Sequence, residues 1–140
     1  MSNSWEMKQG PGFAPAYQVS GTPFVKTISG VGTSPIRVEF PYVSRWVIIS
    51  IHNSTHVAAR IGFSENGVNS NPDANYYLLE TEEKDGGEHS VRTSRLELRC
   101  KEIFIRTDSG SGVTISIIAG LTGIESFPVL TGSNGFKGIG

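Results

Sequence analysis

Residues 43–67 constrain the fold most, because two apolar runs there alternate with a period of two residues. Between residues 46 and 52 one face carries Val47, Ile49 and Ile51. The other face carries both apolar and polar residues, so the strand is apolar enough to lie in mid-sheet. Residues 57–63 alternate more cleanly, which predicts a second strand with one buried and one wetter side. The polar residues 52–56 between them predict a hairpin, and the Asn66-Gly67 pair predicts a turn at its far end.

Short alternating segments of the same kind fill the rest of the body, cut apart by many of the 17 Gly and 7 Pro. Even-numbered apolar positions up to Cys100 give way to odd-numbered ones from Ile103, which predicts a bulge or corner near residues 101–102. No stretch combines helical periodicity with adequate length and caps. The predicted fold is an all-β, single eight-stranded jelly-roll or β-sandwich, about eight strands in two sheets. The expected strands cover residues 24–29, 36–40, 46–52, 57–63, 76–80, 91–98, 101–107 and 113–121, with 91–98 and 101–107 as a pair and polar loops at 68–75 and 81–90.

The chain divides into a body and two tails. Residues 22–124 are the expected sandwich domain, and the chain of 140 residues is large enough to bury roughly 70% of its unfolded surface. Residues 1–21 form an N-terminal arm rich in Gly, Pro, Ser and Gln, with Trp5 and Phe13 as isolated large apolar residues; fully extended it reaches on the order of 70 Å. Residues 125–140 form a C-terminal tail that carries Phe127 and Phe136. The aromatic residues of the arm predict that it packs on a neighbouring subunit, and a disordered tail is the alternative that its composition allows. The C-terminal tail is predicted to dock on the body or on a neighbour.

Composition narrows the function classes. The formal net charge of −1 argues against a chain whose main task is to grip nucleic acid or an anionic membrane. The single cysteine, Cys100, allows no internal disulfide, and no apolar run approaches the length of a membrane span. The N-terminus lacks the features of a signal peptide, so synthesis in a cytoplasm-like environment is expected.

Possible chemical sites each have a simpler interpretation, so no catalytic, cofactor or metal residue is predicted. Residues 69–80 place oxygen side chains as a calcium loop would, but Ala74 stands where a Gly is needed. His52 and His56 flank a turn without a third ligand nearby in sequence. Ser64 fails the pattern of a nucleophile elbow, and Cys100 reads as a small buried hydrophobe.

Charge is distributed unevenly along residues 80–106. An acidic cluster is followed directly by a basic one: Glu80, Glu82, Glu83, Asp85 and Glu88, then Arg92, Arg95, Arg99, Lys101 and Arg106. The simpler interpretation is a solvated loop beside the wet face of a sheet. The alternative is that Glu82 and Glu83 of one subunit meet Arg92 and Arg95 of the next in a ring, where charge complementarity sets the register.

Several turn-and-strand phrases resemble small single-jelly-roll capsid proteins of large icosahedral double-stranded DNA viruses, algal viruses and their giant relatives among them. The phrases are residues 43–47 (VSRWV), 62–68 (GFSENGV), 75–77 (NYY), 95–98 (RLEL), 119–124 (AGLTGI) and 130–136 (LTGSNGF). The resemblance implies a structural protein of the virion capsid, made in the host cytoplasm, typically the pentameric vertex or penton. It implies copies of the chain and neighbouring capsid proteins as partners, with no catalysis and no cofactor.

A carbohydrate- or receptor-binding sandwich, lectin-like or a decoration protein, is the alternative function. Trp46, Tyr76 or Tyr77 would stack on a sugar ring if exposed at a loop tip, although the apolar surroundings of Trp46 predict a place in the core. An enzyme on the same scaffold has no constellation to support it.

Overall fold

Nine strands and one short helix form in the part of the chain that the computed structural model describes, residues 21–69, 75–131, 135–136 and 139. The helix is α2 (Glu65–Asn69). The strands are β1 (Thr22–Val31), β2 (Ile36–Glu39), β3 (Ser44–Asn53), β4 (Ala58–Gly62), β5 (Tyr77–Glu80), β6 (Glu82–Glu83), β7 (His89–Arg92), β8 (Glu102–Thr107) and β9 (Val113–Leu121). The all-β prediction is confirmed, and each of the expected segments overlaps a strand, although the segment 91–98 shares only residues 91–92 with β7.

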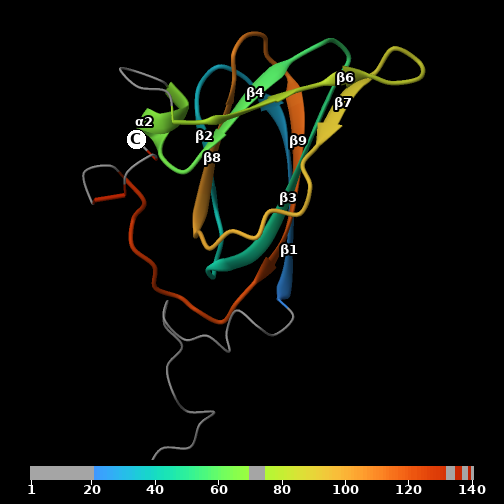
Figure 1. Ribbon diagram of the computed structural model, residues 1–140. Coiled ribbons are helices and arrows are strands. Elements are labelled where there is room, and N and C mark those ends of the chain that lie inside the picture. The colour runs from blue at the N-terminus through green and yellow to red at the C-terminus, as the bar shows by residue number, and fades with distance from the viewer. Residues whose placement is uncertain (1–20, 70–74, 132–134, 137–138, 140) are drawn as a thin grey trace, which may run out of the picture.

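The strands form two antiparallel sheets that face each other, as in a β-sandwich (Figure 1). One sheet has the order β1-β9-β3-β7-β6 and the other the order β2-β8-β4-β5. The chain passes from sheet to sheet between β1 and β2, β2 and β3, β3 and β4, β5 and β6, β7 and β8, and β8 and β9. As predicted, the strand of residues 46–52 lies in mid-sheet, between β9 and β7.

The predicted hairpin is wrong, because β3 and β4 lie in different sheets. β3 pairs with β7 and β9, whereas β4 pairs with β5 and β8. Each strand has one apolar face, and crossing between the sheets turns Ile49 of β3 and Ile61 of β4 into the same interior from opposite sides. The expected pairing of residues 91–98 with 101–107 is wrong for the same reason, since β7 and β8 also lie in different sheets.

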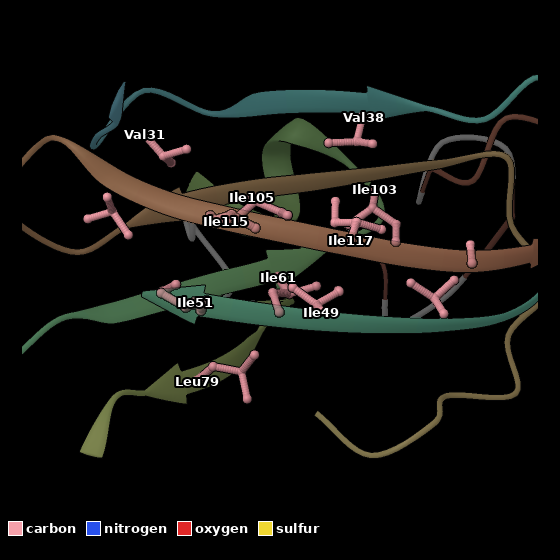
Figure 2. Close-up of a cluster of buried hydrophobic side chains, with 14 of the residues drawn as sticks. Val31, Val38, Ile49, Ile51, Ile61, Leu79, Ile103, Ile105, Ile115 and Ile117 are labelled. Carbon is pink, nitrogen blue, oxygen red and sulfur yellow. The ribbon is translucent and has the colours of Figure 1, made fainter. Parts of the chain in front are cut away.

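The core lies between the two sheets and follows the predicted alternation. Figure 2 shows isoleucine and valine side chains from both layers meeting in the interior. The inner faces of β3 and β9 are completely sealed: Val47, Ile49, Ile51, Val113, Ile115 and Ala119 are all 0% exposed. Phe24 closes one side of the sandwich, where its ring meets that of Phe40 edge to face at 5.0 Å between centroids. Burial of these apolar faces supplies the main driving force for folding.

The phase change near residue 100 is confirmed as a corner rather than a continuous strand. β7 ends at Arg92 and β8 begins at Glu102, and the residues between them cross from one sheet to the other. Ser44, 0% exposed, ties the corner to β3: its Oγ donates to the Leu98 carbonyl at 2.6 Å and accepts from the Cys100 amide at 3.1 Å. The corner therefore has an internal polar anchor in an apolar setting.

Helix α2 replaces the turn that Asn66-Gly67 predicted. The Ser64 hydroxyl accepts a hydrogen bond from the Gly67 amide at 3.0 Å, the geometry of an N-cap. Glu65 then occupies the first turn, where a carboxylate is favoured. Local capping by Ser64 therefore outweighs the turn preference of the Asn-Gly pair.

Candidate interaction surfaces

All of the acidic cluster except Glu80, which belongs to β5, lies in a hairpin that projects beyond the body of the sandwich (Figure 1). The sequence predicted a polar loop over residues 81–90, but Glu82 and Glu83 instead form β6, which pairs with β7. The connection closes with a hydrogen bond from the Lys84 amide to the Glu88 carbonyl at 2.6 Å. Gly86 and Gly87 adopt positive φ angles of 87° and 81°, which only glycine accepts readily. The hairpin thus presents its carboxylates on an ordered ribbon at the edge of the five-stranded sheet.

The structure divides the basic residues between two faces instead of gathering them on one. Arg92 is exposed at the end of β7, where the five-stranded sheet meets the acidic hairpin. Arg95 pairs with Glu97 at 2.8 Å. Arg106 belongs to the other sheet and donates to the Asn69 side chain at 3.0 Å, and the Lys101 ammonium donates to the Glu125 carbonyl. Of these four, Arg92 is the one that lies beside the acidic hairpin, where it lines a cavity together with Glu82 and Lys84.

Arginine side chains cover two of the three aromatic residues considered for stacking on a sugar. The guanidinium of Arg95 lies 5.5 Å from the ring centre of Trp46, and that of Arg60 lies 4.5 Å from the ring centre of Tyr76. Trp46 is half-buried on the outer face of its sheet, so the prediction of a place in the core is wrong. Its indole lies against Gly120, where a Cβ would come within 2.4 Å of Nε1. Tyr77 is different, since it is 67% exposed.

An apolar pocket of about 430 Å³ opens between the sheets beside Tyr77. One wall is β5, and the opposite wall is formed by residues 93–98. Those residues are held to β3 by paired backbone bonds of 2.9 Å between Val47 and Leu96 and by the Thr93 hydroxyl, which accepts from the Ile49 amide at 3.0 Å. The pocket is lined by Ile49, Ile61, Phe63, Tyr77, Leu79, Val91, Arg92, Thr93, Ser94, Leu96, Leu98 and Ile103.

Sequence reasoning missed this pocket, although it identified most of the apolar positions around it. The alternation of Leu96 and Leu98 predicted a paired strand, but both residues are only half-buried because β7 ends before them. The opening of the pocket depends on which strands are not paired with each other, and no local sequence pattern predicts strand pairing.

Several described residues of the C-terminal tail pack on the body, Leu130 against the main core among them. Phe127 contacts the buried pair Val43 and Ile124, next to the hydrogen bond from the Val43 amide to the Ile124 carbonyl at 2.9 Å. Farther along, the Ser64 hydroxyl donates to the Ile139 carbonyl at 2.8 Å, so the end of the tail lies beside α2 (Figure 1).

Of the three remaining aromatic candidates of the tails, one lies among the described residues. Phe136 is half-buried, and its amide donates to the Thr131 carbonyl at 3.2 Å. Trp5 and Phe13 lie outside the described residues.

The chemical alternatives gain no geometric support from the described residues. Most of the proposed calcium loop, residues 70–74, lies outside them, and within the described ranges no three His, Cys, Asp or Glu side chains converge on a metal-sized site. The rings of His56 and His89 meet edge to face with centroids 6.4 Å apart. Ser64 caps a helix, as given above. Burial raises the pKa of the Cys100 thiol to about 11, which keeps it protonated at neutral pH and a poor nucleophile.

No protein-family description, curated protein or solved structure matches the chain. Across the described residues, no helix has the length and apolar character needed to cross a membrane.

Proposed function

We propose that this chain is a structural subunit of an icosahedral viral capsid, forming the pentameric vertex through contacts between subunits and without catalysis. The strand order is the observation that carries the proposal. With the two-residue β6 set aside, the orders β1-β9-β3-β7 and β2-β8-β4-β5, in a chain that repeatedly changes sheet, support a jelly roll built from two Greek keys. Capsid shells and lectins both use jelly rolls, so the fold supports the proposal without deciding between them.

The surfaces favour a role in assembly. A ring of identical chains uses heterologous contacts, in which two different patches of each subunit meet. The hairpin carries Glu82 and Glu83 away from the body, and Arg92 is an exposed cation at the sheet edge. Complementary patches of this kind set register and partner choice more than they set affinity.

Light scattering on the purified chain tests this proposal, with an expected mass about five times the 15.1 kDa of the chain. Reversing Glu82 and Glu83 to Lys should dissociate the ring, whereas Glu65→Lys with Glu125→Lys makes the same change of net charge at other exposed positions and should leave it intact. Adding Arg92→Glu to the first variant should restore assembly, because every interface then carries reversed charges. A native chain that stays monomeric at all concentrations would overturn the proposal.

A carbohydrate-binding role is the second candidate, and exposed Tyr77 beside the polar rim residues Arg92 and Ser94 is the observation in its favour. An aromatic ring next to hydrogen-bonding groups is a suitable platform for a sugar. Specific binding on a glycan array that is lost in Tyr77→Ala would favour this function over the capsid role.

A further inference from the structure

The apolar pocket coincides with a free edge of the four-stranded sheet. Among the described residues, β5 is the last strand of that sheet and pairs with β4 alone. Tyr77 and Leu79 face the pocket, and Leu78, on the other face of β5, is 41% exposed. A strand added to such an edge gains backbone hydrogen bonds, and its alternate side chains enter the adjoining pocket.

The N-terminal arm is the segment of this chain suited to that edge. The C-terminal tail is already engaged, with Phe127 on Val43 and Ile139 at α2. Residues 2–9 (SNSWEMKQ) contain no Gly or Pro and precede the Gly-Pro-Gly of residues 10–12. In an extended segment Trp5 and Met7 share one face, and Ser4, Glu6 and Lys8 share the other.

We propose that residues 2–9 of a neighbouring copy add as a strand to the free edge of β5, with Trp5 filling the apolar pocket between the sheets. This inference rests on the proposed function, because it requires a neighbouring subunit. The polar face of the added segment then lies with Leu78 and Glu80 on the outer surface, where Lys8 meets the exposed Glu80 carboxylate.

The direction in which the arm leaves the body favours a neighbour over the same chain. β1 is the edge of its sheet farthest from β7, so the arm starts on the side of the sandwich opposite the pocket. The eleven residues between Gln9 and Gly21 span at most about 40 Å. The docking therefore requires a ring in which the β1 side of one subunit faces the β5 side of the next, an arrangement that heterologous contacts permit and that places the arm beside the neighbour's pocket.

Cysteine cross-linking between full-length chains tests the docking while keeping Trp5. Chains with Glu6→Cys, and separately Lys8→Cys to cover both registers, are mixed with an affinity-tagged Leu78→Cys chain under mild oxidation. The matched control is Ile118→Cys on the outer face of the other sheet, since Ile118 is 42% exposed and Leu78 is 41% exposed. Cys100 does not compete, because it is buried and its pKa is raised to about 11.

We expect the heterodimer with Leu78→Cys to form at least about tenfold faster than that with Ile118→Cys, because docking raises the effective concentration of the thiols. Trp5→Ala should reduce the rate to that of the control, and Trp5→Phe should preserve it. The docking would be overturned if, for both arm positions, cross-linking to Leu78→Cys were no faster than cross-linking to Ile118→Cys. It would also be overturned if Trp5→Ala left the rate of cross-linking to Leu78→Cys unchanged.

Two further outcomes separate this inference from the proposed function. If light scattering shows an oligomer but cross-linking is not selective, the docking fails and the capsid role stands. If a chain carrying both Glu6→Cys and Leu78→Cys closes on itself in an excess of native chain, the arm binds its own body, which overturns the neighbouring copy as partner.

Discussion

Replacing Ser44 with alanine should destabilise the chain by about 3 kcal/mol, because two backbone groups lose their partner together. The Cys100 amide, which donates to Ser44 Oγ at 3.1 Å, is left unpaired in a buried setting, at a cost of about 1–3 kcal/mol. The partly buried Leu98 carbonyl, now 2.6 Å from the hydroxyl, adds about 1 kcal/mol. Such a loss is a large part of the total stability of a typical domain, about 5–15 kcal/mol.

Urea unfolding at a fixed protein concentration measures this change as a shift of the midpoint at constant slope. In a thermal scan the expected decrease is roughly 9 °C, taking about 3 °C per kcal/mol for a chain of this size. Ser50→Ala is the matched control. Ser50 is also in β3, but its hydroxyl reaches the Ser116 carbonyl only at 3.5 Å, so its loss should stay within about 0.5 kcal/mol.

The result that refutes this reasoning is a Ser44→Ala variant within about 0.5 kcal/mol of the native chain, or one no less stable than Ser50→Ala. Either result would mean that the corner at residues 98–100 is held by packing and that the hydroxyl adds nothing. If the corner does loosen, cross-linking of the arm at β5 should weaken as well, since residues 93–98 form one wall of the pocket.

Three other perturbations have defined outcomes. Gly120→Ala should lower the free energy of unfolding by about 1–3 kcal/mol through collision with the Trp46 indole, and a double-mutant cycle with Trp46→Ala should recover most of that loss; additive effects would contradict the contact. Because burial raises the pKa of Cys100 from 9.0 to about 11, the unfolded chain ionises first as pH rises: stability is full below pH 9 and falls by about 1.4 kcal/mol per unit up to pH 11. Denaturation of Cys100→Ala at the same pH values should lack this component, and an identical slope would refute it. Ser64→Ala should remove both the cap of α2 and the bond to Ile139, costing about 1 kcal/mol and hastening proteolysis of the C-terminal tail; unchanged cleavage would argue against the latter contact.

The faces of the strands could be read from the sequence because a strand has a fixed period of two residues. Ile49 and Ile51 of β3 and Ile115 of β9 are buried as the alternation predicts. The corner before Ile103 could be read in the same way, because a change of phase must occur where the chain turns. The two-residue period of a strand is the same whichever strand it pairs with.

Local patterns failed where a competing interaction prevailed. β6 was missed because two consecutive glutamates have low strand propensity, yet the glycine connection folds them back on β7. α2 was missed because Asn66-Gly67 is a strong turn signal, although Ser64 followed by Glu65 was a readable sign of a helix start. For the interaction surfaces, the sequence located the acidic cluster but did not predict that Arg106 lies apart from Arg92. The two arginines are separated because the successive strands β7 and β8 lie in different sheets.

Taken alone, the sequence determined that this protein is an all-β body with known inward residues, an acidic segment and two aromatic-bearing tails, because composition and two-residue periodicity are local properties. Only the tertiary structure decided that β3 and β4 face each other across the core, since the short connection of residues 54–57 suits a hairpin and a crossing between sheets equally well. It likewise decided that β5 is the outermost strand of its sheet in the described part of the chain and lies beside an apolar pocket. Strand pairing depends on contacts between residues far apart in the chain, and a single sequence carries no local record of them.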